Sequence, residues 1–116
     1  MKLFFDTQSE WIEALQRWAK SDPNVEAVWV FGSRAKGYRT TKEAPEPVPD
    51  LDIGYTLAGE DEGERIAYAI FEVERAREML QAKISVRLDL QLADPADARV
   101  WPAILDHGVQ IYSKKE

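Results

Sequence analysis

Residues 29–40 read WVFGSRAKGYRT, an apolar stretch that runs directly into a glycine and a serine. This boundary has two interpretations. Glycine ends a secondary-structure element wherever the chain must turn sharply. Alternatively, the backbone N–H groups of a turn between a strand and a helix can hold a phosphate group, and glycine lets that group approach the main chain. Taken alone, the stretch favours the simple turn, so the neighbouring segments have to decide.

The segments before this turn predict a helix followed by a buried strand. Thr7 and Glu10 fit a capping box, which predicts a helix that begins at Thr7. The apolar residues behind it recur at helical spacing, and the Asp-Pro-Asn sequence of residues 22–24 ends the helix. The apolar residues 25–31 are typical of a strand that is covered on both faces.

The segments after the turn continue an alternation of strands and helices. Residues 38–49 (YRTTKEAPEPVP) have three prolines among their last five residues, which predicts an irregular loop. The elements expected after it are a strand at 50–57, a long helix from residue 64 to about 81, an alternating strand at 84–92, a short helix at about 95–107 and a closing strand at 109–112. This order predicts an α/β or α+β fold, in which the long helix makes the strands 50–57 and 84–92 parallel neighbours.

Three aspartates fall on the polar faces of these two strands. Asp50 and Asp52 are two residues apart, so both side chains leave the same face, and Asp89 lies on the polar face of the other strand. If the faces coincide, the carboxylates repel one another unless a proton or a cation neutralises them. Oxygen ligands without histidine or cysteine suit Mg²⁺ or Mn²⁺. A solvated strand face is the alternative, but aspartate is disfavoured within strands, so the combination with the glycine-serine turn favours a metal site.

Length and composition limit the kind of protein. A chain of 116 residues without an internal repeat predicts a single domain, residues 1–116. Cysteine is absent, which excludes disulfides and thiolate metal sites, and no signal-peptide or membrane-span pattern is visible, so a cytoplasmic protein without a membrane partner is expected. The formal net charge of -6 argues against broad nucleic-acid binding, which depends on lysine and arginine.

Three short motifs together resemble a known superfamily. Residues 32–37 (GSRAKG), 50–53 (DLDI) and 87–90 (RLDL) are similar to the GSxxxG, DxD and hDh elements of the DNA polymerase β-like nucleotidyltransferases. The small size and the ending of residues 104–112 (ILDHGVQIY) bring the chain closest to the minimal nucleotidyltransferases, the MNT domains of MntA-type antitoxins. The resemblance extends from about residue 11 to residue 112.

The resemblance implies a fold and a set of site residues. The fold is a small mixed β-sheet flanked by helices, like the palm of polymerase β, and two divalent metal ions, Mg²⁺ or Mn²⁺, bind to it. Gly32 and Ser33 match the positions that hold the terminal phosphates of the nucleotide. Asp50 and Asp52 match the metal-bridging pair, and Asp89 matches the third carboxylate, which helps to deprotonate the attacking hydroxyl.

Two basic residues lie within the segments that resemble the family, but their roles are open. Arg34 directly follows the glycine-serine pair, so it is a candidate for phosphate contact and equally for a solvated position on the turn. His107 directly precedes Gly108, and we interpret it as a residue at the end of a helix rather than as a catalyst.

Two functions from different classes are expected. The first is an enzyme that moves a nucleoside monophosphate, AMP from ATP, to a hydroxyl group, and the resemblance implies a tyrosine of a HEPN-domain toxin as the acceptor. The alternative is a non-catalytic protein of the same fold that neutralises its partner by contact. The intact Asp50, Asp52 and Asp89 favour the enzyme.

Overall fold

The computed structural model describes residues 2–35, 50–94 and 99–115 and shows four strands and several helices in alternation. The elements are α1 (Lys2–Ser21), β1 (Val25–Phe31), β2 (Leu51–Leu57), α2 (Glu62–Tyr68), the π-helical segment η2 (Ala69–Val73), α3 (Glu74–Gln81), β3 (Leu88–Leu92), α4 (Val100–His107) and β4 (Val109–Ser113). The predicted class, an α/β fold with a small sheet flanked by helices, is confirmed. Within the described ranges, no helix is long and apolar enough to cross a membrane.

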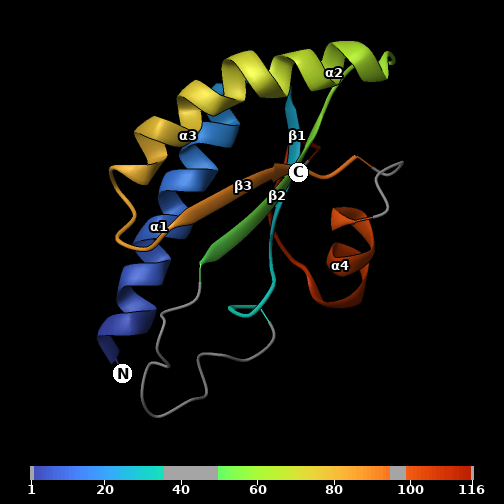
Figure 1. Ribbon diagram of the computed structural model, residues 1–116. Coiled ribbons are helices and arrows are strands. Elements are labelled where there is room, and N and C mark those ends of the chain that lie inside the picture. Colours follow the sequence, from blue (N-terminus) through green and yellow to red (C-terminus); the bar gives the residue numbers. More distant parts are fainter. Residues whose placement is uncertain (1, 36–49, 95–98, 116) are drawn as a thin grey trace.

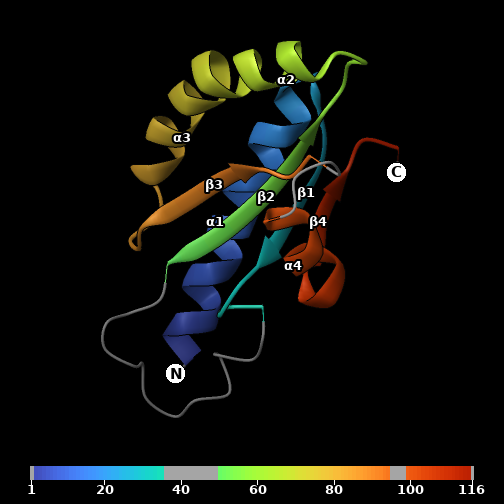
Figure 2. The same cartoon turned by 45° about the vertical axis from the view of Figure 1, so that its right-hand side comes forward.

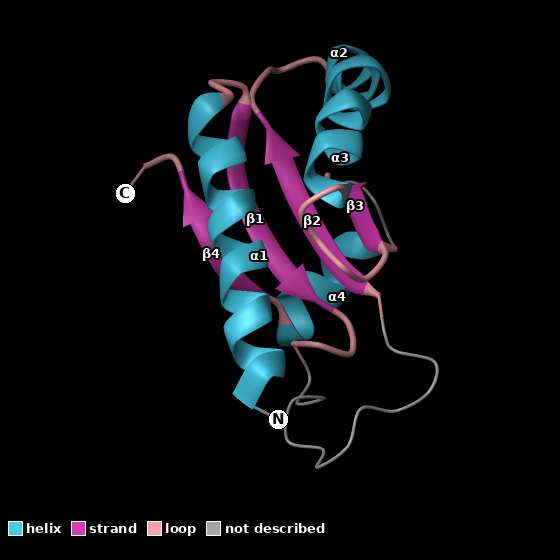
Figure 3. Ribbon diagram, turned by 90° about the vertical axis from the view of Figure 1, so that its left-hand side faces the viewer, coloured by secondary structure: helices cyan, strands magenta, loops and turns pink. Residues whose placement is uncertain are grey.

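The four strands form one mixed sheet in the order β3-β2-β1-β4. Strand β1 runs antiparallel to both β2 and β4, whereas β2 and β3 are parallel. The parallel pair is joined by the run of α2, η2 and α3, as the sequence predicts, and Figure 2 shows this run as one continuous curved helix. Figure 3 shows α1 lying across the strands on one face of the sheet.

Helices cover the two faces of the sheet unequally. Figures 1 and 3 agree that α1 and α3 lie on one face and α4 on the other. The larger apolar core lies on the first face; its fully buried members include Leu15, Val25, Val28, Leu51 and Ile53. A smaller cluster lies under α4 and consists of Phe31, Ala93, Val100 and Ile104. Because β1 contributes to both clusters, it is covered on both faces, as its apolar run predicts.

Two predicted element starts are wrong. Helix α1 begins at Lys2, so Thr7 lies inside it and does not cap it. A capping box contributes only about 1 kcal/mol, so it does not by itself oblige the helix to begin at Thr7. Strand β3 begins at Leu88 and not at residue 84, because its partner β2 begins at Leu51, the residue paired with Leu88.

The side chain of Gln81 replaces strand pairing in the segment before β3. Its amide nitrogen donates to the carbonyl oxygens of Ile84 (3.1 Å) and Val86 (2.7 Å), and its amide oxygen accepts from the Leu88 N–H (2.8 Å). One side chain therefore satisfies the backbone groups that an alternating strand would have paired with a neighbour.

Other boundaries differ by a few residues. The helix after β2 begins at Glu62, two residues earlier than expected, because Asp61 caps it by accepting from the Glu64 N–H (3.2 Å). Strand β2 begins one residue after Asp50, and α4 begins at Val100. The predicted loop of residues 38–49 and the predicted helix start at residues 95–98 lie outside the described residues.

The main core should depend on Leu15, whose side chain is fully buried between α1 and the sheet. Leu15→Ala should lower the free energy of unfolding by about 2–4 kcal/mol, because the truncation removes buried methyl groups and leaves a cavity. Urea unfolding measures the loss. Leu105→Ala is the matched control: Leu105 is 69% exposed and its truncation should cost about 0.5 kcal/mol or less. Equal losses in the two variants would contradict the described core.

Candidate functional site

Asp52 and Asp89 lie side by side on the central parallel pair of strands. They are direct partners in the register of β2 and β3. Gly54, two residues beyond Asp52, faces Ile104 of α4, so the carboxylates belong to the face of the sheet that α4 covers only in part. The sequence prediction that Asp52 and Asp89 share one face of neighbouring strands is confirmed.

The proximity of these carboxylates changes the protonation of Asp52. The pKa of Asp52 is raised from 3.8 to about 6, chiefly by burial, and also by the charges of Asp89 and Asp50 and a hydrogen bond with Asp89. The positive charge of Arg34 opposes this shift. In the absence of a cation, a proton on Asp52 therefore relieves the repulsion, as expected for two carboxylates in one site.

Asp50 stands slightly apart from this pair. It precedes β2 and its carboxylate lies 3.4 Å from the guanidinium of Arg87, in an ion pair whose side chains are 38% and 76% exposed. Among residues 2–35, 50–94 and 99–115, no three acidic, histidine or cysteine side chains are arranged to hold a metal ion directly. Exposed ion pairs contribute little, so Asp50 can leave Arg87 and turn toward Asp52 at small cost. The donor set of Asp50, Asp52 and Asp89 then suits a hard divalent cation.

The glycine-serine turn packs directly on the Asp52 carboxylate. Gly32 follows Phe31, the residue paired with Asp52, and has a φ of +73°, a conformation that favours glycine. A Cβ atom at position 32 would lie 2.1 Å from Oδ2 of Asp52, which is far inside contact distance. The interpretation of Gly32 as a tight turn is therefore confirmed, and the close approach that it permits here is that of the Asp52 carboxylate. Whether the turn holds a phosphate stays a prediction. Ser33, the next residue, is exposed.

A contact across the fold holds this turn. The Gly32 N–H donates to Nε2 of His107 over 2.9 Å, although 75 residues separate them in sequence. His107 is the last residue of α4, as its interpretation as a helix-end residue expects. The sequence did not predict that His107 accepts a hydrogen bond from Gly32. Only the packing of α4 on the sheet brings the imidazole to the turn, and no local sequence pattern indicates that packing.

Arg34 lies in the interior and not at the surface. Only 2% of it is exposed, and its guanidinium lies over the ring of Trp11, 5.2 Å from the ring centroid. The alternative interpretation of Arg34 as a solvated turn residue is therefore wrong. Its charge stays close enough to act on Asp52, so it supplies a fixed positive charge behind the acidic pair.

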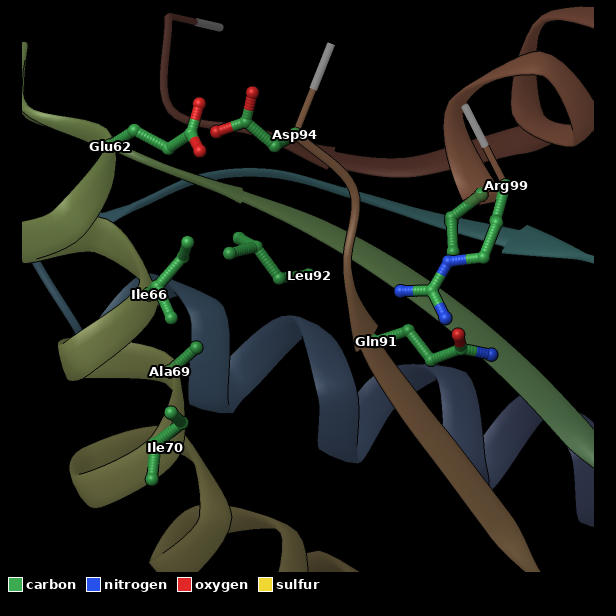
Figure 4. A pocket seen from close by; sticks show the side chains of 9 residues that line it. Glu62, Ile66, Ala69, Ile70, Gln91, Leu92, Asp94 and Arg99 are labelled. Atoms are coloured by element: carbon green, nitrogen blue, oxygen red, sulfur yellow. The ribbon is translucent and has the colours of Figure 1, made fainter. Parts of the chain in front are cut away.

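A groove adjoins the acidic pair on the side of β3. Gln91 lies on the same face of β3 as Asp89, and its amide nitrogen donates to Oδ2 of Asp89 over 2.9 Å. Gln91 also lines an open groove of about 530 Å³ between the α2–η2 helix and the start of α4, a size typical of small-molecule sites. Figure 4 shows its mixed lining, with apolar side chains from the helix and polar ones at the rim: Glu62, Ile66, Ala69, Ile70, Gln91, Leu92, Asp94, Arg99 and Val100.

Comparison with known proteins identifies the fold. A family model described as "Polymerase beta, Nucleotidyltransferase" matches residues 13–116. Among solved structures, a chain of a toxin-antitoxin crystal structure with AMP-PNP superimposes with a TM-score of 0.54 at 18% identity, covering 90% of this chain and 74% of that chain. A chain from the complex of a tri-AMPylated Shewanella oneidensis HEPN toxin with an MNT antitoxin also gives 0.54, at 16% identity and coverages of 94% and 74%. No curated protein matches the sequence significantly.

The raised pKa of Asp52 predicts a pH dependence of stability in metal-free buffer. Because the pKa is about 6 in the folded state and 3.8 ordinarily, the stabilisation is present in full below pH 3.8 and is lost as the pH rises through about 6. The full shift corresponds to about 3 kcal/mol, and solvent screening of the partly exposed carboxylate reduces the expected loss to about 1–2 kcal/mol.

Urea unfolding in EDTA from about pH 3 to about pH 7.5 checks this dependence, because that range extends roughly one to two pH units beyond the two pKa values, 3.8 and about 6. Asp52→Asn should remove the fall in stability. Asp89→Asn should reduce it, because the charge of Asp89 raises the pKa of Asp52 more than the charge of Asp50 does. Parallel pH profiles for the wild type and Asp52→Asn would show that the carboxyl of Asp52 is not perturbed.

Proposed function

Because the chain belongs to the polymerase β nucleotidyltransferase family, we propose that it transfers AMP from ATP to a hydroxyl group of a protein partner. The observation that carries this proposal is the contact of the Gly32 turn with the Asp52 carboxylate, next to Asp89. A phosphate-holding turn placed directly on an acidic pair is what transfer from a metal-bound triphosphate requires.

The acidic residues have distinct tasks in this proposal. Asp52 and Asp89, joined by Asp50 once it leaves Arg87, would hold two Mg²⁺ or Mn²⁺ ions. Bound there, such ions would supply positive charge that stabilises the attacking and the leaving oxygen of the displacement. Asp89 would also accept the proton of the acceptor hydroxyl, whose oxygen forms a bond to the α-phosphorus of ATP while the bond to the leaving pyrophosphate breaks. Its place at the edge strand, beside the open groove, leaves room for an acceptor to reach it.

The turn and its neighbours hold the nucleotide. Gly32 brings the backbone close to the site, and Ser33 is exposed where the terminal phosphates would lie. Arg34 is too deeply buried to reach a phosphate group in solvent. It therefore supports nucleotide binding through its positive charge behind the carboxylates. These residues therefore orient the triphosphate while the aspartates act on the reacting atoms.

A HEPN-type toxin is the acceptor that we propose, through one of its tyrosines. The support comes from structures of the same fold, in which a HEPN toxin is AMPylated in complex with an MNT antitoxin and a toxin-antitoxin pair is seen with AMP-PNP. The described part of the chain forms one sheet with its helices. In this proposal, a separate protein partner therefore presents the acceptor hydroxyl group. We also expect such a pair to act in the cytoplasm.

ATP and Mg²⁺ together should raise the melting temperature more than either one alone. The carboxylates leave part of each cation's shell to phosphate oxygens, so metal and nucleotide stabilise each other's binding to the folded state. Thermal unfolding with ATP, with Mg²⁺ and with both measures this coupling. Equal shifts for ATP with and without Mg²⁺ would contradict a metal-dependent site.

Two aspartate variants separate binding from transfer. Asp52→Asn should abolish both nucleotide binding and transfer, because it removes the carboxylate nearest the Gly32 turn. Asp89→Asn should weaken ATP binding modestly and lower AMP transfer by about two or more orders of magnitude, the pattern of a group that acts mainly in the transition state. Calorimetry measures binding, and labelled ATP with a HEPN-type protein as the candidate acceptor measures transfer.

The matched control for these variants is Glu78→Gln, an exposed acidic position on α3 that should change neither quantity. Transfer by Asp89→Asn at the wild-type rate would exclude Asp89 from the chemistry. A wild-type protein that silences its partner without transferring AMP would instead support the non-catalytic alternative.

A further inference from the structure

We propose that His107 is a positioning residue that fixes the Gly32 turn through a neutral imidazole protonated on Nδ1. The hydrogen bond itself follows from the geometry alone, whereas its effect on nucleotide binding rests on the function proposed above. His107 lies in the ending of residues 104–112 that resembles the family, but it is outside the glycine-serine motif and the acidic cluster.

The direction of the hydrogen bonds defines the form of the imidazole. A backbone N–H can only donate, so Nε2 of His107, 2.9 Å from the Gly32 nitrogen, must be the unprotonated acceptor. The proton then resides on Nδ1, which donates to Oδ2 of Asp106 over 3.1 Å. The His107 side chain is 15% exposed, so little water competes for the contact with Gly32.

Both ends of this hydrogen bond are anchored by the same sheet. Gly32 lies two residues beyond Val30, and His107 lies two residues before Val109, the partner of Val30 in the antiparallel pair of β1 and β4. Gly108 makes the short link, because a Cβ atom there would lie 2.7 Å from the carbonyl oxygen of Ile104. The imidazole therefore bridges the end of β1 and the end of α4 where the ladder leaves them close together.

The turn requires such a bridge because glycine has unusual conformational freedom. Gly32 adopts a φ of +73°, but a glycine reaches other conformations at little cost. A change of conformation at Gly32 would alter the close packing of the turn against Oδ2 of Asp52. The hydrogen bond that Gly32 donates to His107, at the end of α4, favours the conformation that keeps the turn against the acidic pair.

Nuclear magnetic resonance tests the hydrogen bond without any ligand. His107 is the single histidine of the chain, so a long-range ¹H–¹⁵N spectrum of the whole protein reports one imidazole. Above neutral pH we expect the neutral form protonated on Nδ1, with a scalar coupling between the Gly32 amide and Nε2. A spectrum of the form protonated on Nε2 would overturn the proposal, because that nitrogen cannot accept from Gly32.

Two matched substitutions test the positioning role. His107→Gln places an amide oxygen near the position of Nε2, whereas His107→Asn reaches only to the position of Nδ1 and leaves the Gly32 N–H without this acceptor. With Mg²⁺ and either ATP or inorganic tripolyphosphate, calorimetry should show His107→Gln within about twofold of the wild-type affinity. His107→Asn should bind about five- to tenfold more weakly, the usual effect of one lost hydrogen bond.

A variant of Asp106 serves as the control for the two His107 variants. Asp106→Asn keeps an acceptor for Nδ1 and should bind as the wild type does, because Asp106 is 78% exposed and lies away from the turn. Equal affinities for His107→Gln and His107→Asn, whether both high or both low, would overturn the positioning role. If the wild type binds neither probe, the proposed function fails, and the imidazole spectrum still decides the hydrogen bond.

Discussion

The parallel register of β2 and β3 forces the carboxylates of Asp52 and Asp89 to lie beside each other. The rest of the site follows from this constraint. Burial of Asp52 and the like charge of Asp89 both disfavour its ionised form, and together they are the main causes that raise the pKa of Asp52 to about 6. In the proposed function, a cation bound beside this pair would relieve the same repulsion that a proton on Asp52 relieves in its absence.

The surroundings of the pair divide the remaining work between conformation and charge. The Gly32 turn contributes shape, because only a residue without a Cβ atom fits against Oδ2 of Asp52. Arg34 contributes charge from the interior, stacked on Trp11 of α1, so the main core and the site share one side chain. Helix α4 connects these parts, since it packs on Gly54 through Ile104 and reaches the turn through His107.

Much of this arrangement could be predicted from the sequence, because it depends on short-range patterns. Alternation placed Asp52 and Asp89 on one face, and the helical run between their strands implied a parallel pair, which the register confirms. The burial of Arg34 and the reach of His107 could not be predicted, because each depends on how a helix docks on the sheet. The early start of α1 and the late start of β3 were missed for a related reason: hydrogen-bonding partners, and not local preference, decide where an element begins.

The two arginines beside the acidic residues differ in exposure, and this difference has a consequence for ion exchange. Arg87 is 76% exposed and holds Asp50 in a loose pair, whereas only 2% of Arg34 is exposed. In the proposed metal site, a cation that binds Asp50 would displace the exposed Arg87, whereas the buried Arg34 would keep its place. Dissolved salt screens exposed charges most strongly, so it weakens the ion pair of Asp50 with Arg87 far more than it weakens the effect of Arg34 on Asp52.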